Sequence, residues 1–265
     1  MCSSDLFVVD ELLARRLAAD GALAEDREPV AEVRDTFGLY GPRAGERTVW
    51  LTEPGFAALP APTRTRLVRS RLADDADLVP SVRAWGARVA AARRQADGHR
   101  FVWWPSTLAG LEAPVLTRYV EAGRRTSRHL EVPDAVWSAA ADAAPRAREL
   151  AGRFPAHSGP NCFGAVMAAT GVPGADLVWM QREPFEEWLA ARTRPGGSDA
   201  EPGTVLVWRS PDSAVQHAAL TLGGGWALHK PSQGWMSPTK VLGVAQCLAS
   251  ARASGRRLER RSLVA

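Results

Sequence analysis

Three consecutive glycines, Gly223 to Gly225, lie between two short segments of period two, and this feature constrains the fold of the chain most strongly. HAALTL precedes the glycines, WALHK follows them, and TVLVW lies a few residues upstream. A period of two is typical of β-strands, and a glycine-rich step between two strands is typical of a hairpin turn. Because helical segments precede these strands, the sequence predicts an α+β fold that ends in an antiparallel sheet.

The length of the turn decides which side chains share a face of this hairpin. If the three glycines form the loop, Leu222 faces Trp226 and the numbers of paired residues sum to 448. Ala219 then faces His229, and His217 lies two residues farther along the same face, at a diagonal of about 7–8 Å. A two-residue loop would turn one histidine to the opposite face. The predicted histidine pair therefore depends on the turn.

Cys162 stands in the first turn of a short apolar helix predicted within SGPNCFGAVMAATG, residues 158–171. Asn161 or Ser158 could cap this helix. Unpaired N–H groups at a helix start lower the pKa of a thiol and favour the nucleophilic thiolate, although a buried structural cysteine fits the same position. The two histidines on one hairpin face favour catalysis, because a thiolate that transfers an acyl group needs a proton carrier and a group that orients it.

Zinc is the rival use of one cysteine and two histidines, with water as the fourth ligand. The sequence has no CxxC or HExxH spacing that would preorganise such a site, so it predicts neither a metal nor a cofactor. Cys247 lies in an apolar run where packing is the expected role, and Cys2 lies in an end segment. Three tryptophans flank the proposed site along the chain and either wall a substrate pocket or pack in the core, with the core favoured: Trp208, Trp226 and Trp235.

The first half of the chain predicts helices separated by two short strands, without a spacing of Cys, His or carboxylates that chemistry would require. The predicted helices are FVVDELLARRLA, TRTRLVRSRLA, SVRAWGARVAAARRQA and APVLTRYVEAGRRTSRHL, and the predicted strands are RTVWLT and HRFVWW. A further helical segment begins after Pro133. We therefore expect a mostly helical region of unknown role at 1–133 and a catalytic domain at 134–265.

Charge and hydropathy argue against several classes of partner. The chain has 265 residues with 33 basic and 29 acidic side chains, and all basic residues except Lys230 and Lys240 are arginines. The basic cluster GRRLERRS near the C-terminus predicts a solvated helix face or tail, so no nucleic-acid partner is expected. The first residues lack the pattern of a signal peptide, and no segment approaches about 18 apolar residues, so the sequence predicts a cytoplasmic protein without membrane contact.

Residues 150–245 resemble the NlpC/P60 branch of the papain-like cysteine peptidases. In that family an apolar helix opens with the catalytic cysteine, here in Asn161-Cys162-Phe163-Gly164, and a strand introduced by a Pro-Gly pair follows, here PGTVLVW. The family's two histidine strands are matched by HAALTLGGG, which begins at His217, and by ALHKPSQG around His229. The resemblance implies a papain-like helix followed by an antiparallel sheet, here preceded by the mostly helical region.

By position, the resemblance implies that Cys162 is the nucleophile, that His217 is the general base and then the acid, and that His229 orients His217. The backbone N–H of Cys162 would be one oxyanion donor. The family's tyrosine upstream of its cysteine is absent, which leaves His157 or Ser158 as a substitute donor. Asn161 is a further polar neighbour of the nucleophile.

The resemblance predicts a cysteine-dependent hydrolase, a peptidase or amidase that cleaves an amide or peptide bond of a small substrate through an acyl-enzyme on Cys162. The alternatives are an acyltransferase that uses the same three residues and a non-catalytic module that keeps the fold and only binds. Neither the substrate nor the oligomeric state is encoded in a pattern of this sequence.

Overall fold

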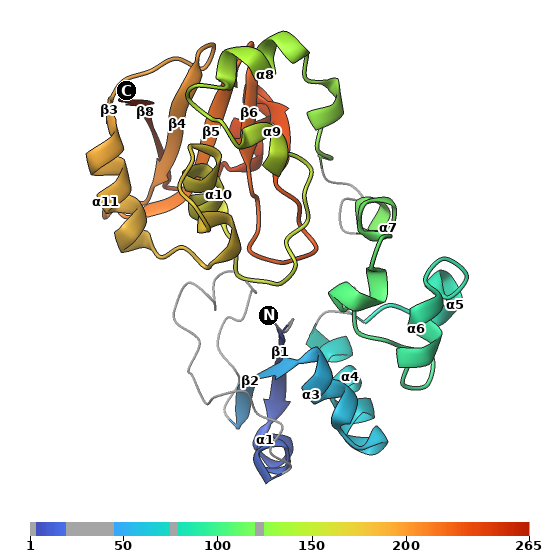
Figure 1. Ribbon diagram of the computed structural model, residues 1–265. Helices are drawn as coiled ribbons and strands as arrows, with labels where there is room; N and C mark the ends of the chain where they lie inside the picture. Colours follow the sequence, from blue (N-terminus) through green and yellow to red (C-terminus); the bar gives the residue numbers. More distant parts are fainter. Residues whose placement is uncertain (1–3, 20–44, 75–78, 120–124, 265) are drawn as a thin grey trace. The chain divides into compact units, whose positions relative to one another are not determined.

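The computed structural model describes residues 4–19, 45–74, 79–119 and 125–264 and divides the chain into two compact units (Figure 1). The N-terminal unit comprises residues 1–115 together with 156–158, and the C-terminal unit comprises residues 116–155 and 159–265. Each unit combines helices with antiparallel strands, so the predicted α+β class is confirmed. The papain-like type stays a prediction.

The N-terminal unit is built on a two-stranded antiparallel sheet with short helices and its own apolar core. β1 Ser4–Asp10 pairs with β2 Glu46–Thr52. The core includes the buried side chains of Phe7, Phe56 and Trp104, whose rings pack within 5.6 to 6.5 Å of one another. The helices of this region are α1 Glu11–Ala19, α3 Glu53–Ala58, α4 Ala61–Asp74, α5 Val82–Trp85, α6 Ala90–Gln95, the 3-10 turn η2 Pro105–Leu108 and α7 Glu112–Tyr119.

The predictions for FVVDELLARRLA and HRFVWW in this unit are wrong in part. FVVDELLARRLA is not one helix: its first residues belong to β1, and α1 begins at Glu11, next to Asp10, whose Oδ1 accepts a hydrogen bond from Leu13 N at 2.7 Å. Pairing with β2 overrides the helical spacing of its apolar residues. The predicted strand HRFVWW joins no sheet in the described part of the chain. Phe101 to Trp104 are buried, but within the described residues the backbone of this segment forms only isolated β-bridges at Arg100.

Other predicted elements of this half are found in place. RTVWLT is confirmed as β2, and TRTRLVRSRLA is confirmed as α4. SVRAWGARVAAARRQA forms two short helices, α5 and α6, on either side of Gly86, instead of one. A glycine favours such a break because it has the most backbone freedom to lose in a helix.

The C-terminal unit begins before residue 133, where we expected the boundary. Arg128 N donates a hydrogen bond to Val241 O at 2.7 Å, Lys240 Nζ donates to Arg125 O at 2.9 Å, and Val132 is buried in this unit's core. These contacts attach residues 125–132 to the sheet, so the division falls before Leu116. Of APVLTRYVEAGRRTSRHL, only α7 and the 3-10 turn η3 His129–Glu131 are helical among the described residues; 120–124 lie outside them.

The C-terminal unit contains a six-stranded antiparallel sheet in the order β3-β8-β4-β5-β6-β7. Its strands are β3 Thr193–Pro195, β4 Pro202–Arg209, β5 Val215–Gly223, β6 Trp226–His229, β7 Lys240–Gly243 and β8 Arg257–Leu263. Its helices are α8 Asp134–Ala140, α9 Ala147–Leu150, α10 Cys162–Ala169, the 3-10 turn η4 Ala175–Leu177, α11 Arg182–Arg192 and α12 Val244–Ser250.

The two faces of this sheet belong to separate apolar cores. Figure 1 shows α8, α9 and α10 over one face, and the buried cluster there includes Cys162 together with Val207 and Ala218. The cluster on the other face packs Trp208 and Ala219 against α12. Since side chains of neighbouring strand residues point to opposite faces, strands β4, β5, β6 and β7 contribute to both cores. The sheet therefore forms the middle layer of the unit.

The hairpin turn differs from the prediction, but the register beyond it does not. Gly223 pairs with Trp226, so the turn holds two residues, and the prediction that Leu222 faces Trp226 is wrong. A register shift just before the turn compensates, since Leu220 pairs with Leu228 and the sum of 448 is restored. Such a bulge adds one unpaired residue to one strand. The two histidines therefore keep the same face.

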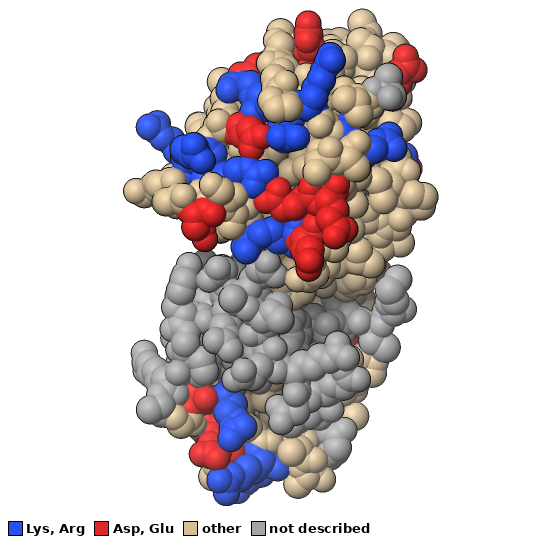
Figure 2. Space-filling view, turned by 90° about the vertical axis from the view of Figure 1, so that its left-hand side faces the viewer, with Lys and Arg blue, Asp and Glu red and all other residues tan. Residues whose placement is uncertain are grey.

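The basic cluster GRRLERRS lies in strand β8, so the prediction of a solvated helix face or tail is wrong. β8 pairs with both β3 and β4. Arg260 lies 2.7 Å from Asp199, and Arg261 lies 2.7 Å from Glu259. Figure 2 shows basic and acidic side chains interspersed over this unit. These arginines pair with carboxylates and support the sheet.

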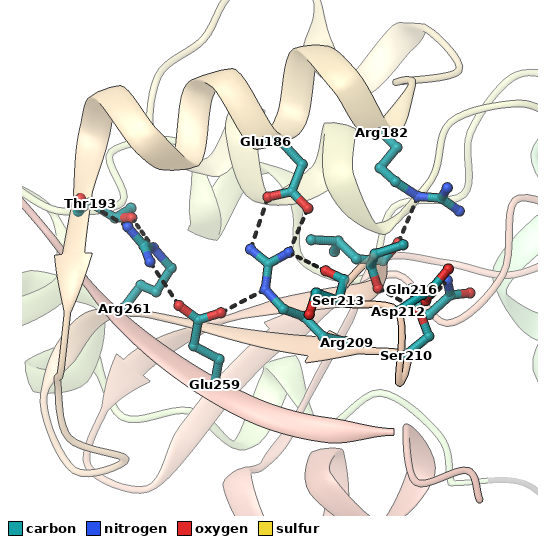
Figure 3. Close-up of polar contacts among 12 residues, drawn as sticks. Arg182, Glu186, Thr193, Arg209, Ser210, Asp212, Ser213, Gln216, Glu259 and Arg261 are labelled. Carbon is teal, nitrogen blue, oxygen red and sulfur yellow. Dashed lines mark hydrogen bonds and ion pairs between the residues drawn. The ribbon is translucent and has the colours of Figure 1, made fainter. Parts of the chain in front are cut away.

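A charged network joins α11 to the sheet at Arg209 (Figure 3). The Arg209 guanidinium donates two hydrogen bonds to Glu186 of α11, at 2.5 and 2.8 Å, and one to Glu259 of β8 at 2.6 Å. Arg261 also donates to Glu259, at 2.7 Å. Because every charge in the group has an opposite partner, the network accounts for the position of α11 without a ligand.

Candidate active site

Asn161 caps the helix that carries the candidate nucleophile. Its backbone is extended, its Oδ1 accepts a hydrogen bond from Gly164 N at 3.0 Å, and α10 begins at Cys162. Its Nδ2 donates to the carbonyl oxygen of Met180 at 2.7 Å and ties the cap to the segment before α11. Of the two caps that the sequence left open, the structure selects Asn161 over Ser158.

Asn161→Ala is expected to lower the free energy of unfolding of the C-terminal unit by about 2 kcal/mol. The substitution removes the cap and leaves the N–H of Gly164 and the carbonyl of Met180 without this partner at a buried position. Urea unfolding measures the loss. Asn161→Ser keeps a capping oxygen and should lose less; an equal loss in both variants would mean that the bond to Met180 alone holds the helix start.

The sulfur of Cys162 is buried against main-chain N–H groups. The backbone groups of Ala218, Phe163 and Cys162 itself favour the thiolate, and so does the charge of Lys230. Burial is the larger effect and raises the pKa of the Cys162 thiol to about 11. The groups at the helix start lower this pKa as expected, but burial outweighs them, so the net pKa is raised and the side chain is a neutral thiol in the resting structure.

The predicted histidine pair is formed. His217 Nε2 lies 3.4 Å from His229 Nδ1, and the two rings are nearly perpendicular at 89°. The His217 ring also packs on Trp208, with 5.2 Å between ring centroids. Burial lowers the pKa of His217 to about 4 and lowers that of His229 well below its usual value. Both imidazoles are therefore neutral at neutral pH.

The two histidines differ in their remaining ring nitrogens. His229 Nε2 is fully buried and has no hydrogen-bond partner among the residues that the structure describes. His217 Nδ1 is not among the buried unpartnered atoms, and within the described residues the hydrogen bonds of this ring involve Nε2 alone. His217 Nδ1 is therefore the nitrogen that solvent or a reacting group can reach.

The structure brings the thiol close to the backbone of His217 but not into a hydrogen bond with its ring. The Ala218 N–H that acts on the sulfur belongs to the residue directly after His217 in β5. The His217 ring packs on Trp208 in the α12 cluster, whereas Cys162 belongs to the α10 cluster. Among the described residues, no hydrogen bond joins the thiol to either imidazole. The structure therefore forms the histidine pair on the α12 face of the sheet but does not bring it together with the thiol, which belongs to the core on the α10 face.

Lys230 is the residue of this site that the sequence prediction missed. It follows His229 at the end of β6, it is 2 % exposed, and its charge acts on both Cys162 and His229. The sequence did contain a signal for Lys230. Only two of the chain's 33 basic residues are lysines, and Lys230 directly follows the predicted site residue His229.

The other predicted residues are grouped with the N-terminal unit, pack in or against a core, or lie outside the described residues. His157 and Ser158 are grouped with the N-terminal unit, where His157 Nδ1 lies 3.0 Å from Ser158 O. Trp208 and Trp235 are buried, and Trp226 is partly buried beneath the Arg128 guanidinium at 4.8 Å. Cys247 is fully buried in α12, and Cys2 lies outside the described residues.

A cavity of about 250 Å³ lies in the N-terminal unit, and none of the Cys162-site residues lines it. Its walls include Phe56, Trp104, Glu53, Arg64 and Arg94. Within the described ranges of the chain, no group of three or more His, Cys, Asp or Glu side chains could hold a metal ion. In the same ranges, no helix is long and apolar enough to cross a membrane.

Comparison of the chain with models of known protein families, with curated protein sequences and with solved structures finds no match. The candidate site is therefore defined by its own geometry: a helix-capped thiol, a buried lysine whose charge acts on it, and a histidine pair on the other face of the sheet.

Proposed function

We propose that the C-terminal unit is a cysteine-dependent hydrolase of the NlpC/P60 kind, which cleaves an amide or peptide bond of a small substrate through an acyl-enzyme on Cys162. The observation that carries this proposal is the contact of His217 Nε2 with His229 Nδ1 at 3.4 Å. It orients the His217 ring and leaves Nδ1 as the nitrogen that can take a proton from a thiol. The same roles follow from the family resemblance.

In the proposed reaction the Cys162 sulfur attacks the substrate carbonyl carbon while its proton passes to His217 Nδ1. His217 then gives this proton to the leaving amine, the C–N bond breaks, and a thioester to Cys162 remains. Water attacks the thioester, loses a proton to His217, and the acid leaves as the thiol is restored. Backbone N–H groups at the start of α10, including that of Cys162, are donors for the developing oxyanion.

The proposal includes a movement of the His217 side chain. In the resting structure its ring packs on Trp208, while the sulfur lies against the N–H of Ala218. Because His217 faces the α12 core and Cys162 belongs to the α10 core on the opposite face of the sheet, proton transfer requires a rearrangement at the start of β5 that brings Nδ1 to the face of the sulfur. Catalytic hydrogen bonds of this kind often shorten only in the substrate complex.

The test is a search for the acyl-enzyme. A panel of N-acyl amino acid and peptide p-nitroanilides is incubated with the full chain, and peptide mass spectrometry follows Cys162. We expect release of nitroaniline and a transient acyl adduct on Cys162, with neither in Cys162→Ala. Added amines that yield a transfer product in place of the free acid would assign the acyltransferase alternative.

A non-catalytic binding module is the second candidate, and the burial of the thiol favours it. Cys162 is 9 % exposed, and burial opposes its ionisation. If no substrate of the panel leaves an adduct and Cys162 reacts with alkylating agents no faster than the fully buried Cys247, the binding module replaces the hydrolase.

A further inference from the structure

Lys230 is a buried ammonium held by the loop that follows it. Its Nζ donates hydrogen bonds to the carbonyl oxygens of Ser232 at 2.5 Å, Gly234 at 3.1 Å and Ser237 at 2.9 Å. An ammonium has three N–H donors and a neutral amine has two, so three carbonyl acceptors match the charged form. The loop is thereby folded around a fixed positive charge.

The strand register places this charge beside the candidate nucleophile. Leu220 pairs with Leu228, and the same register continued past the end of β6 puts Lys230 opposite Ala218. The backbone of Ala218 contacts the Cys162 sulfur, and the charges of Lys230 and Cys162 act on each other. Lys230 therefore approaches the sulfur from the open end of the hairpin.

The other ionisable groups around Lys230 come from the neighbouring strands. Lys240 of β7 disfavours the charged form of Lys230, and both lysines disfavour the charged form of His229 in β6. His217 of β5 acts on His229. Cys162 of α10 is the group whose negative charge favours the ammonium of Lys230.

We propose that Lys230 is a positioning residue of the Cys162 site, whose ammonium, fixed by the loop carbonyls, stabilises negative charge on the Cys162 sulfur. This deepens the proposed function and rests on it for its catalytic meaning. The charge acts whenever the sulfur becomes negative, both in the attacking thiolate and in the thiolate that leaves as the thioester breaks.

Thiol reactivity as a function of pH tests the proposal without any substrate. Methyl methanethiosulfonate, a small thiolate-specific reagent, is applied to the full chain from pH 5.5 to 9.5, and peptide mass spectrometry separates Cys162 from the other thiols. Burial lowers the pKa of Lys230 to about 7, so its charge is present below that pH and lost above it. We expect the wild-type rate to rise less steeply with pH near 7, where the charge disappears.

Lys230→Met is expected to react about tenfold more slowly than wild type at pH 6.5 and at nearly the same rate at pH 9.5. If the ratio of the wild-type rate to the Lys230→Met rate is the same at every pH, Lys230 has a structural role only. A wild-type profile without the shallower region near pH 7 would also overturn the proposal. Lys230→Gln keeps two N–H donors without the charge and should behave like Lys230→Met. It decides the question if Lys230→Met does not fold.

Two internal controls accompany this measurement. Lys240 is also buried, but it acts on Lys230 rather than directly on Cys162, so Lys240→Met should move the shallow region to higher pH without slowing the reaction at pH 6.5. Cys247, whose pKa burial raises to about 12, reports unfolding by becoming reactive. A pH-dependent ratio together with no acyl-enzyme in the substrate panel would refute the hydrolase and keep the role of Lys230.

Discussion

His217→Ala is expected to reduce the kcat/KM for amide cleavage by about 100- to 10,000-fold, the usual contribution of a general acid–base residue. The loss should be large because the Cys162 thiol is neutral in the resting structure, with a pKa near 11, and cannot attack unless a base removes its proton. His229→Ala should cause a smaller loss, since it removes the group that orients His217 and leaves the base in place. Rates with the best substrate of the panel measure both.

The pH dependence of the wild-type rate follows from the same burial. His217 is active as a base only when neutral, and its pKa is lowered to about 4, so kcat/KM should fall below about pH 4 rather than near the usual 6.5. On the alkaline side the rate should step down near pH 7, where the Lys230 charge is lost, and the lower plateau should extend toward the thiol pKa of about 11. An acid limb between pH 6 and 7 would mean that the imidazole is solvated, and not buried, when it acts.

His99→Ala is the matched control for the two histidine variants. His99 is exposed and lies in the N-terminal unit, so its removal should leave kcat/KM unchanged. If His217→Ala is as active as His99→Ala while Cys162→Ala is inactive, another group accepts the thiol proton and the assignment of the base is wrong.

Gly164→Ala is expected to destabilise the C-terminal unit by about 2–3 kcal/mol. A Cβ at this position would collide with the carbonyl oxygen of Ala175, a backbone atom of η4 that cannot turn aside. Alanine is the better helix former by about 1 kcal/mol, so helix propensity alone predicts the opposite sign. The cost of the clash should exceed the gain in helix propensity, because α10 and η4 are in close backbone contact at Gly164. Thermal or urea unfolding decides the sign.

Gly234→Ala serves as the comparison for this substitution. A Cβ at Gly234 would meet the Ser232 hydroxyl at 3.4 Å, an ordinary contact, and should change the stability little. Because Gly164 lies two residues after Cys162 in the first turn of α10, the Gly164 variant should also slow Cys162 labelling or turnover. A Gly164→Ala protein as stable as wild type would show that α10 can move away from η4.

The periodicity of apolar residues predicted strands correctly where a strand pairs with the next strand along the chain. The alternation in HAALTL and WALHK predicts β5 and β6, and the register that joins the histidines survives an unforeseen bulge at the turn. It predicted the wrong structure where a strand pairs with a segment far away in the sequence. FVVDELLARRLA opens with a strand because β2 pairs with it, and the basic GRRLERRS is a strand because β3 and β4 enclose it.

The candidate site divides in the same way. The sequence alone determined the helix start at Cys162, two candidates for its cap and the shared face of His217 and His229, since each depends on residues a few positions apart or on one hairpin. Only the tertiary structure decided the burial that raises the pKa of the thiol, the separation of the thiol from the imidazole ring, and the approach of Lys230. These depend on how α10 and the loop after β6 pack on the sheet, and packing between distant segments leaves no period in a sequence.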